Sequence, residues 1–183
     1  MEIVVIGAIR VLGALPVLRW AFVGGLVAVF VDLSDLLWMN LLDLGGLGNY
    51  QRFDKYSDQV YMVAFLIVAW RWQGVAKHVA LALFSYRLVG FAVFEATGDR
   101  NLLLFFPNVF EFWFLFIASL PHWYPRFHGK DFCFTPRNVV LWLSFLTVIK
   151  LIQEFVLHEG RWLDEITFVE ALEAAWETLQ SPF

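Results

Sequence analysis

The chain has 183 residues, of which 60% are hydrophobic and 16% are charged, and its formal net charge is −4. A mean hydropathy of +0.66, together with 20 Phe and 9 Trp, argues against a water-soluble domain and is typical of a protein built from transmembrane helices. The acidic balance argues against a nucleic-acid partner, and the single Cys133 excludes an intrachain disulfide.

Six apolar segments follow one another along the chain. A helix that crosses a bilayer needs roughly 20 apolar residues, or fewer where protein shelters it. The first segment is short and contains Arg10 and Pro16, so the first two segments form either two spans or one long kinked span. We therefore expect residues 1–157 to form an all-α, polytopic integral membrane bundle of five to six transmembrane helices, located in the plasma (inner) membrane. The predicted spans cover residues 3–18, 20–39, 56–71, 77–96, 102–120 and 138–157.

The segments between these spans carry the loop and interface signals. Residues 42–52 are predicted to be a loop, because Gly45, Gly46 and Gly48 disfavour a helix. With six spans, four Lys or Arg residues flank the membrane on the side of the N-terminus and six on the other side, which slightly favours an external N-terminus. Tryptophans fall at proposed span ends, as in an aromatic belt: Trp20, Trp38, Trp70, Trp72 and Trp123.

Residues 158–183 are predicted to form a separate amphipathic helix. Its apolar residues recur at steps of three and four, and its other face is acidic, with Glu170, Glu173 and Glu177 among the carboxylates. A helix adsorbed on anionic lipid normally carries Lys and Arg on its polar face. The acidic face favours packing on the protein itself, on a second copy in a homodimer, or on a partner protein.

Two pairs of aspartates lie where apolar segments end and begin. Asp32 and Asp35 are three residues apart, and Asp54 and Asp58 are four apart, so each pair shares one face of a helix. On neighbouring helices the four carboxylates can converge, and a hard divalent cation, Mg²⁺ or Mn²⁺, relieves their repulsion. The alternative interpretation is that these aspartates mark helix ends that face water, with Asp54 as an N-cap.

Other charged residues fall inside the apolar segments. Arg87, in the middle of the fourth span, is predicted either to bind a phosphate or to pair with Glu95, Glu111 or an aspartate. Asn108 and Glu111 share a helix face that lines a cavity or holds helices together. Lys150 and Glu154, four residues apart, are predicted to neutralise each other.

The aspartate spacing resembles the signature of the CDP-alcohol phosphatidyltransferases, in which Asp32, Asp35, Asp54 and Asp58 fall on the four Asp positions. The resemblance covers roughly residues 10–90. It implies that Asp32, Asp35 and Asp54, with Asp58 in contact, hold metal ions, that Asp58 is the base that deprotonates the acceptor alcohol, and that Arg87 meets a phosphate. The donor would be a CDP-linked lipid. Other positions of the signature, normally Gly, Ala or Arg, are occupied here by Leu36, Met39, Asn40 and Tyr50.

Three functional hypotheses follow. The first is a divergent, metal-dependent, phosphatidyltransferase-like protein that acts on a lipid head group. The second is a non-catalytic membrane scaffold that keeps the helical core and assembles through its acidic C-terminal helix. The third is a small transporter or channel subunit whose polar path runs through Arg87, Asn108 and Glu111.

Overall fold

The computed structural model describes the backbone of residues 2–34, 50–98, 102, 105–123 and 134–158, and side chains from residue 7 to 153 within these ranges, except 50–58 and 122–123. All regular structure in these ranges is helical, which confirms the all-α prediction. The elements are α1 (Glu2–Ala14), the 3₁₀ helix η1 (Leu15–Leu18), α2 (Ala21–Leu33), α4 (Tyr50–Trp70), α5 (Gly74–Thr97), α6 (Val109–Trp123) and α7 (Pro136–His158).

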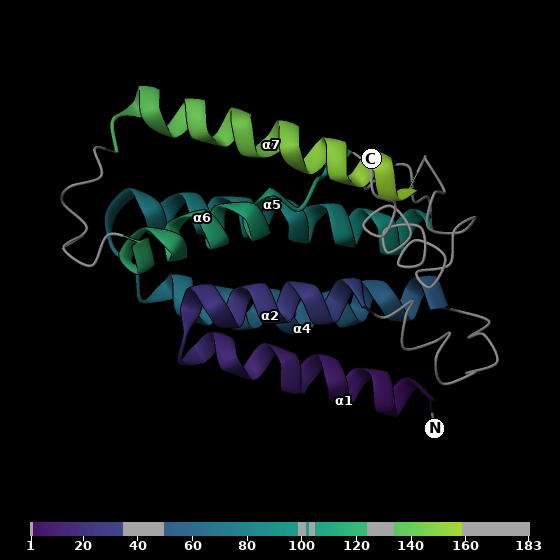
Figure 1. The fold of residues 1–183 in the computed structure, drawn as a ribbon. Helices are drawn as coiled ribbons and strands as arrows, with labels where there is room; N and C mark the ends of the chain where they lie inside the picture. Colours follow the sequence, from purple (N-terminus) through teal and green to yellow (C-terminus); the bar gives the residue numbers. More distant parts are fainter. Residues whose placement is uncertain (1, 35–49, 99–101, 103–104, 124–133, 159–183) are drawn as a thin grey trace, which may run out of the picture.

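The helices lie side by side along one axis, and successive helices run in opposite directions (Figure 1). Helix α6 packs against α2, α4, α5 and α7, whereas α1 and α7 lie on opposite outer sides of the bundle. The helices η1, α4 and α6 end, and α2, α5 and α7 begin, at one end of the bundle, which we call the hairpin end. Helices α1 and α4 begin, and α2, α5 and α7 end, at the opposite end, whereas the shorter α6 begins about halfway along the bundle.

The first two apolar segments form two antiparallel helices and not one kinked span. The carbonyl of Pro16 accepts hydrogen bonds from the backbone N–H groups of Arg19 (3.1 Å) and Trp20 (2.9 Å), which closes the turn. Gly24 of α2 lies directly against this turn, and a Cβ at Gly24 would overlap the backbone of Pro16 and Val17. The chain can reverse this tightly because α2 presents no side chain at Gly24.

Two helix starts predicted from the sequence were wrong. Helix α4 begins at Tyr50, so the predicted loop 42–52 runs into a helix at its end, because its glycines stop at Gly48. Helix α6 begins at Val109, although the apolar segment begins at residue 102. Pro107 disfavours the helical conformation for the residue before it, so a helix over this segment starts after the proline.

Aromatic side chains from α4, α6 and the α4–α5 connection fill the centre of the bundle. The rings of Phe65 and Phe114 stack with their centroids 4.0 Å apart, and the ring of Trp72 also stacks on Phe114, with their centroids 5.3 Å apart. Trp113 is fully buried, and its indole N–H donates to the carbonyl of Ala76 at 3.1 Å. These contacts fix α4, α5 and α6 against one another and bury every polar atom of the indole with a partner.

The outer surface of the described bundle is rich in large apolar side chains. Phe30 is 69% exposed, Leu12 65% and Val140 61%. By length and composition, one described helix, α5, is able to cross a membrane, and shorter apolar stretches lie in the regions 7–18, 21–33, 59–70 and 109–121.

Candidate functional site

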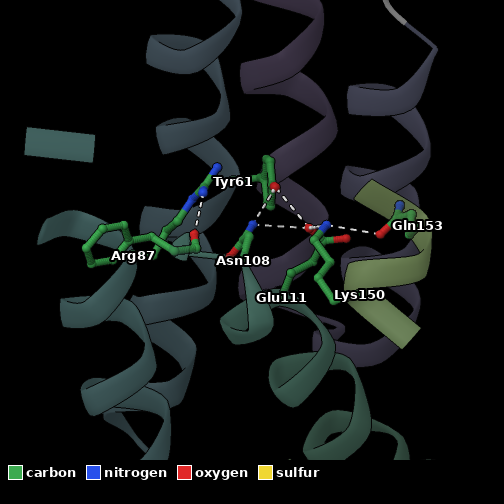
Figure 2. Close-up of polar contacts among 7 residues, drawn as sticks. Tyr61, Arg87, Asn108, Glu111, Lys150 and Gln153 are labelled. Atoms are coloured by element: carbon green, nitrogen blue, oxygen red, sulfur yellow. Dashed lines mark hydrogen bonds and ion pairs between the residues drawn. The ribbon is translucent and has the colours of Figure 1, made fainter. Parts of the chain in front are cut away.

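A buried carboxylate, Glu111 in the first turn of α6, is the centre of a polar network inside the bundle. Only 4% of the residue is exposed. Its Oε2 atom accepts hydrogen bonds from the Tyr61 hydroxyl (3.2 Å), the Asn108 side-chain amide (3.2 Å) and the Lys150 ammonium (3.3 Å). Figure 2 shows the three donors converging on this one oxygen. The network therefore joins α4, α6 and α7.

The donors of Glu111 are themselves held by further contacts. The Asn108 amide also donates to the Tyr61 hydroxyl at 3.1 Å, so these two side chains are bonded to each other as well as to Glu111. Lys150 donates to Oε1 of Gln153 at 3.0 Å, and its ammonium lies 5.3 Å from the centroid of the Phe112 ring. An ion pair in this interior is favourable only because additional bonds satisfy both charges.

Arg87 of α5 binds the chain where it approaches α6. Its Nη1 donates to the carbonyl of Phe106 at 2.6 Å, and the neighbouring Tyr86 hydroxyl donates to the carbonyl of Phe105 (Figure 2 shows Arg87). Gly90, one turn further along α5, lies against Phe106, and a Cβ there would overlap that side chain. Arg87 thus satisfies a backbone carbonyl that precedes the helix, in a position where only 8% of the residue is exposed.

A second buried ion pair joins α1 to α2. Nη1 of Arg10 lies 2.9 Å from Oδ1 of Asp32, and the side chains are 3% and 19% exposed, respectively. Ser34, just after α2, donates its hydroxyl back to the carbonyl of Val31 at 2.8 Å, which closes the C-terminal turn. The cation in mid-α1 is therefore neutralised by the first of the four aspartates.

The structure describes only one of the four aspartate side chains. Asp35 and the side chains of Asp54 and Asp58 lie outside the described residues. The backbone positions of Asp54 and Asp58 are in α4, which packs against α2 and begins at the end of the bundle where α2 finishes. Among the side chains that the structure does describe, no three metal-ligating groups come together. The divalent-metal site therefore stays a prediction.

The remaining charged positions acquire specific partners. Among the described residues, no carboxylate forms an ion pair with Arg87, whose bond goes to the Phe106 carbonyl, and its role toward a phosphate stays a prediction. Lys150 pairs with Glu111 of another helix, whereas the side chain of its predicted partner Glu154 lies outside the described residues. Residues 159–183, the proposed acidic helix, also lie outside them.

Three members of these clusters were not found from the sequence: Tyr61, Gln153, and Arg10 as the partner of Asp32. The shared face of Asn108 and Glu111 follows from their spacing, but partners on other helices depend on packing, which spacing within one helix does not reveal. No family model, curated protein or solved structure matches this chain, so its interpretation rests on its own residues and geometry.

Proposed function

We propose that the chain is a multi-pass integral membrane protein. Its surface is apolar on α1, α2, α4, α5 and α7, whereas Arg10, Arg87, Glu111 and Lys150 are buried. Water would favour the reverse arrangement, because exposed apolar patches of this extent are unfavourable in solution and buried charges are costly. In lipid, ionisable residues face the bundle interior and pair with one another or with backbone carbonyls, as these do.

The helix lengths support this placement. Helices α4, α5 and α7 contain 21, 24 and 23 residues. At about 1.5 Å per residue these are roughly 31, 36 and 35 Å long, against a hydrocarbon core of about 30 Å. Helix α5 is apolar over a spanning length, whereas the apolar stretch of α4 covers residues 59–70. Helix α6 is shorter, with 15 residues, but it is surrounded by four other helices. Irregular backbone such as residues 105–108 is tolerated at membrane depth when protein covers it.

Within this membrane protein, the function that we propose is metal-dependent transfer on a lipid head group. The observation that carries it is that α2, with Asp32 in its last turn, packs against α4, which begins at the same end and contains positions 54 and 58. Asp32, Asp35 and Asp54 would hold a divalent cation, Mg²⁺ or Mn²⁺, with Asp58 as its neighbour and as the base for an acceptor alcohol.

The donor set fits such a cation in its chemistry, because hard divalent ions prefer carboxylate oxygens. The bound ion would neutralise charge on phosphate oxygens of the substrate. Arg10 already occupies one side of Asp32, and it reduces the net negative charge that a metal would meet there.

Replacement of Asp58 by asparagine is expected to abolish transfer while leaving the fold intact. Loss of a general base lowers the rate by roughly 10²–10⁴-fold. The measurement is incorporation of label from CDP-diacylglycerol by membranes that contain the protein, with Mg²⁺ or Mn²⁺ present and with a chelator as a metal-free arm. The wild type is expected to incorporate label only with metal.

Asp43→Asn serves as the matched control, since it makes the same change in the connection between α2 and α4 but outside the four signature positions. It should keep wild-type incorporation. Equal incorporation by Asp58→Asn and the wild type, or none by the wild type with any of a panel of acceptor alcohols, contradicts the transferase proposal.

The Glu111 network favours a second candidate, a pathway for protons or small cations. A buried carboxylate that accepts from a hydroxyl and an amide, paired with an ammonium that donates to an amide oxygen, is typical of proton relays in membrane proteins. If this pair carries protons, purified protein in vesicles should acidify the lumen under an imposed potential, as read by an enclosed pH-sensitive dye.

The Glu111→Gln/Lys150→Met double variant, which removes both charges together, should reduce that acidification to the level of protein-free vesicles. Wild-type vesicles that behave like protein-free ones exclude the pathway. Asp58→Asn should leave the signal unchanged, so the two candidate functions respond to different substitutions.

A further inference from the structure

The hairpin end of the bundle carries a set of cations that neither candidate function uses. Arg19 follows η1, Arg71 and Lys77 flank the α4–α5 connection, and Arg137 lies in the first turn of α7. Arg19, Arg71 and Arg137 are exposed, and Lys77 is partly exposed. These residues come from three separate connections, which the fold brings to one face.

Acidic residues are absent from the described part of this end. Residues 15–22, 67–79, 117–123 and 134–141 contain no Asp or Glu. Of the described carboxylate side chains, Asp32 and Glu95 lie in the last turns of α2 and α5, at the opposite end. The third, Glu111, lies about halfway along the bundle, where it is paired with Lys150. The described charge is thus segregated along the bundle axis, with unpaired cations at the hairpin end.

Exposed tryptophans accompany these cations. Trp20 and Trp70 are about three-fifths exposed, and each lies under a cation: the Arg19 guanidinium carbon is 5.7 Å from the Trp20 ring centroid, and the Lys77 ammonium is 4.8 Å from that of Trp70. Indole rings favour the depth of the lipid head groups, and Lys and Arg there reach toward phosphates. The hairpin end therefore has both the aromatic and the cationic part of a membrane-interface anchor.

We propose that the hairpin end lies in the head-group layer of the cytoplasmic leaflet and binds acidic phospholipids through Arg19, Arg71, Lys77 and Arg137. This inference rests on the membrane placement proposed above and is independent of the transferase activity. Cationic connections remain on the cytoplasmic side of a membrane, where the surface potential is negative. Each such cation raises the affinity for an anionic surface by roughly fivefold.

The chain's own acidic C-terminal segment is a poor alternative occupant. It follows α7, which ends at His158 at the opposite end of the bundle. A bilayer therefore separates the start of that segment from the hairpin-end cations. Acidic head groups are the anions that lie next to this end in any membrane that contains them.

The lipid contact is tested by thermal unfolding of the purified protein in nanodiscs of phosphatidylcholine alone or with one-quarter phosphatidylglycerol. The wild-type midpoint is expected to rise with phosphatidylglycerol, and 0.5 M NaCl should reduce the rise. In the variant Arg19→Gln/Arg71→Gln/Lys77→Gln/Arg137→Gln, phosphatidylglycerol should no longer raise the unfolding midpoint. The matched variant Arg19→Lys/Arg71→Lys/Arg137→Lys keeps all four positive charges. Its unfolding midpoint should still rise with phosphatidylglycerol. Equal midpoints in the two lipids for the wild type overturn the lipid contact.

The side of the membrane is tested with two single-cysteine proteins in a Cys133→Ser background. Gln73→Cys places a thiol at the hairpin end and Thr97→Cys at the opposite end, both at exposed positions. In intact cells, an impermeant maleimide should label Thr97→Cys and should label Gln73→Cys only after permeabilisation. The reverse pattern overturns the orientation, whereas a protein absent from the membrane fraction overturns the membrane proposal itself.

Discussion

Replacement of Lys150 by methionine is expected to destabilise the protein by about 3–5 kcal/mol, the usual cost of leaving one member of a buried ion pair without the other. The methionine fills a similar volume, so the loss comes from the Glu111 carboxylate, which keeps its hydrogen bonds from Tyr61 and Asn108 but loses its counter-charge. Helix α7 packs on α6, and the Lys150–Glu111 bond is a polar link between them. Chemical unfolding in mild detergent, followed by tryptophan fluorescence, measures the change.

The double variant Glu111→Gln/Lys150→Met provides the decisive comparison. It removes both charges, and a buried pair replaced as a whole is often tolerated without loss of stability. We therefore expect it to be more stable than Lys150→Met alone. The control is Lys77→Met, which removes a partly exposed lysine at the hairpin end. It should lower the free energy of unfolding by no more than about 1 kcal/mol. A Lys150→Met protein that unfolds like the wild type would show that Glu111 does not depend on this ammonium.

Substitution of Gly24 by alanine is the second change for which we expect a large effect. The added methyl group would overlap the backbone of Pro16 and Val17, which cannot rotate away as a side chain can. Overpacking of this kind costs about 1–3 kcal/mol or more, and the η1–α2 turn must move apart to relieve it. The expected result is a lower midpoint of unfolding and easier proteolysis between α1 and α2.

Gly7→Ala is the matched control, because a Cβ at Gly7 of α1 would meet no other atom within 4 Å. Alanine favours a helix interior over glycine by about 0.5–1 kcal/mol, so this variant should be slightly stabilised. If both alanine variants raise stability equally, the close packing of η1 on α2 is wrong.

The helices were predictable from the sequence because apolar length is a strong local signal. Each of the six predicted segments contains a helix in the described part of the chain, of which α5 is long and apolar enough to cross a membrane. The ends of these helices depend on single residues. Pro107 delays α6 to Val109, and the absence of glycine after Gly48 lets α4 begin at Tyr50. The reversal at Pro16 was left open, because the contact that permits it involves Gly24, eight residues later on another helix.

The polar site was only partly predictable, because contacts between different helices cannot be read from spacing within one helix. Asn108 and Glu111 are three residues apart and therefore share a face, which their spacing alone reveals. Their partners Tyr61 and Lys150 lie 47 and 39 residues away along the chain from Asn108 and Glu111, respectively. Such pairings depend on which helices are neighbours, and an apolar pattern does not specify neighbours. Arg10 and Asp32 were each noticed, but their pairing requires the α1–α2 hairpin.

The segregation of charge along the bundle has a consequence for the chemistry of any donor substrate. The orientation that we propose, with the cationic end in the cytoplasm, would place Asp32 and the start of α4 on the opposite, external side of the membrane. Soluble nucleotides are made and consumed in the cytoplasm, so an activated head group used at this face must be carried there on a lipid.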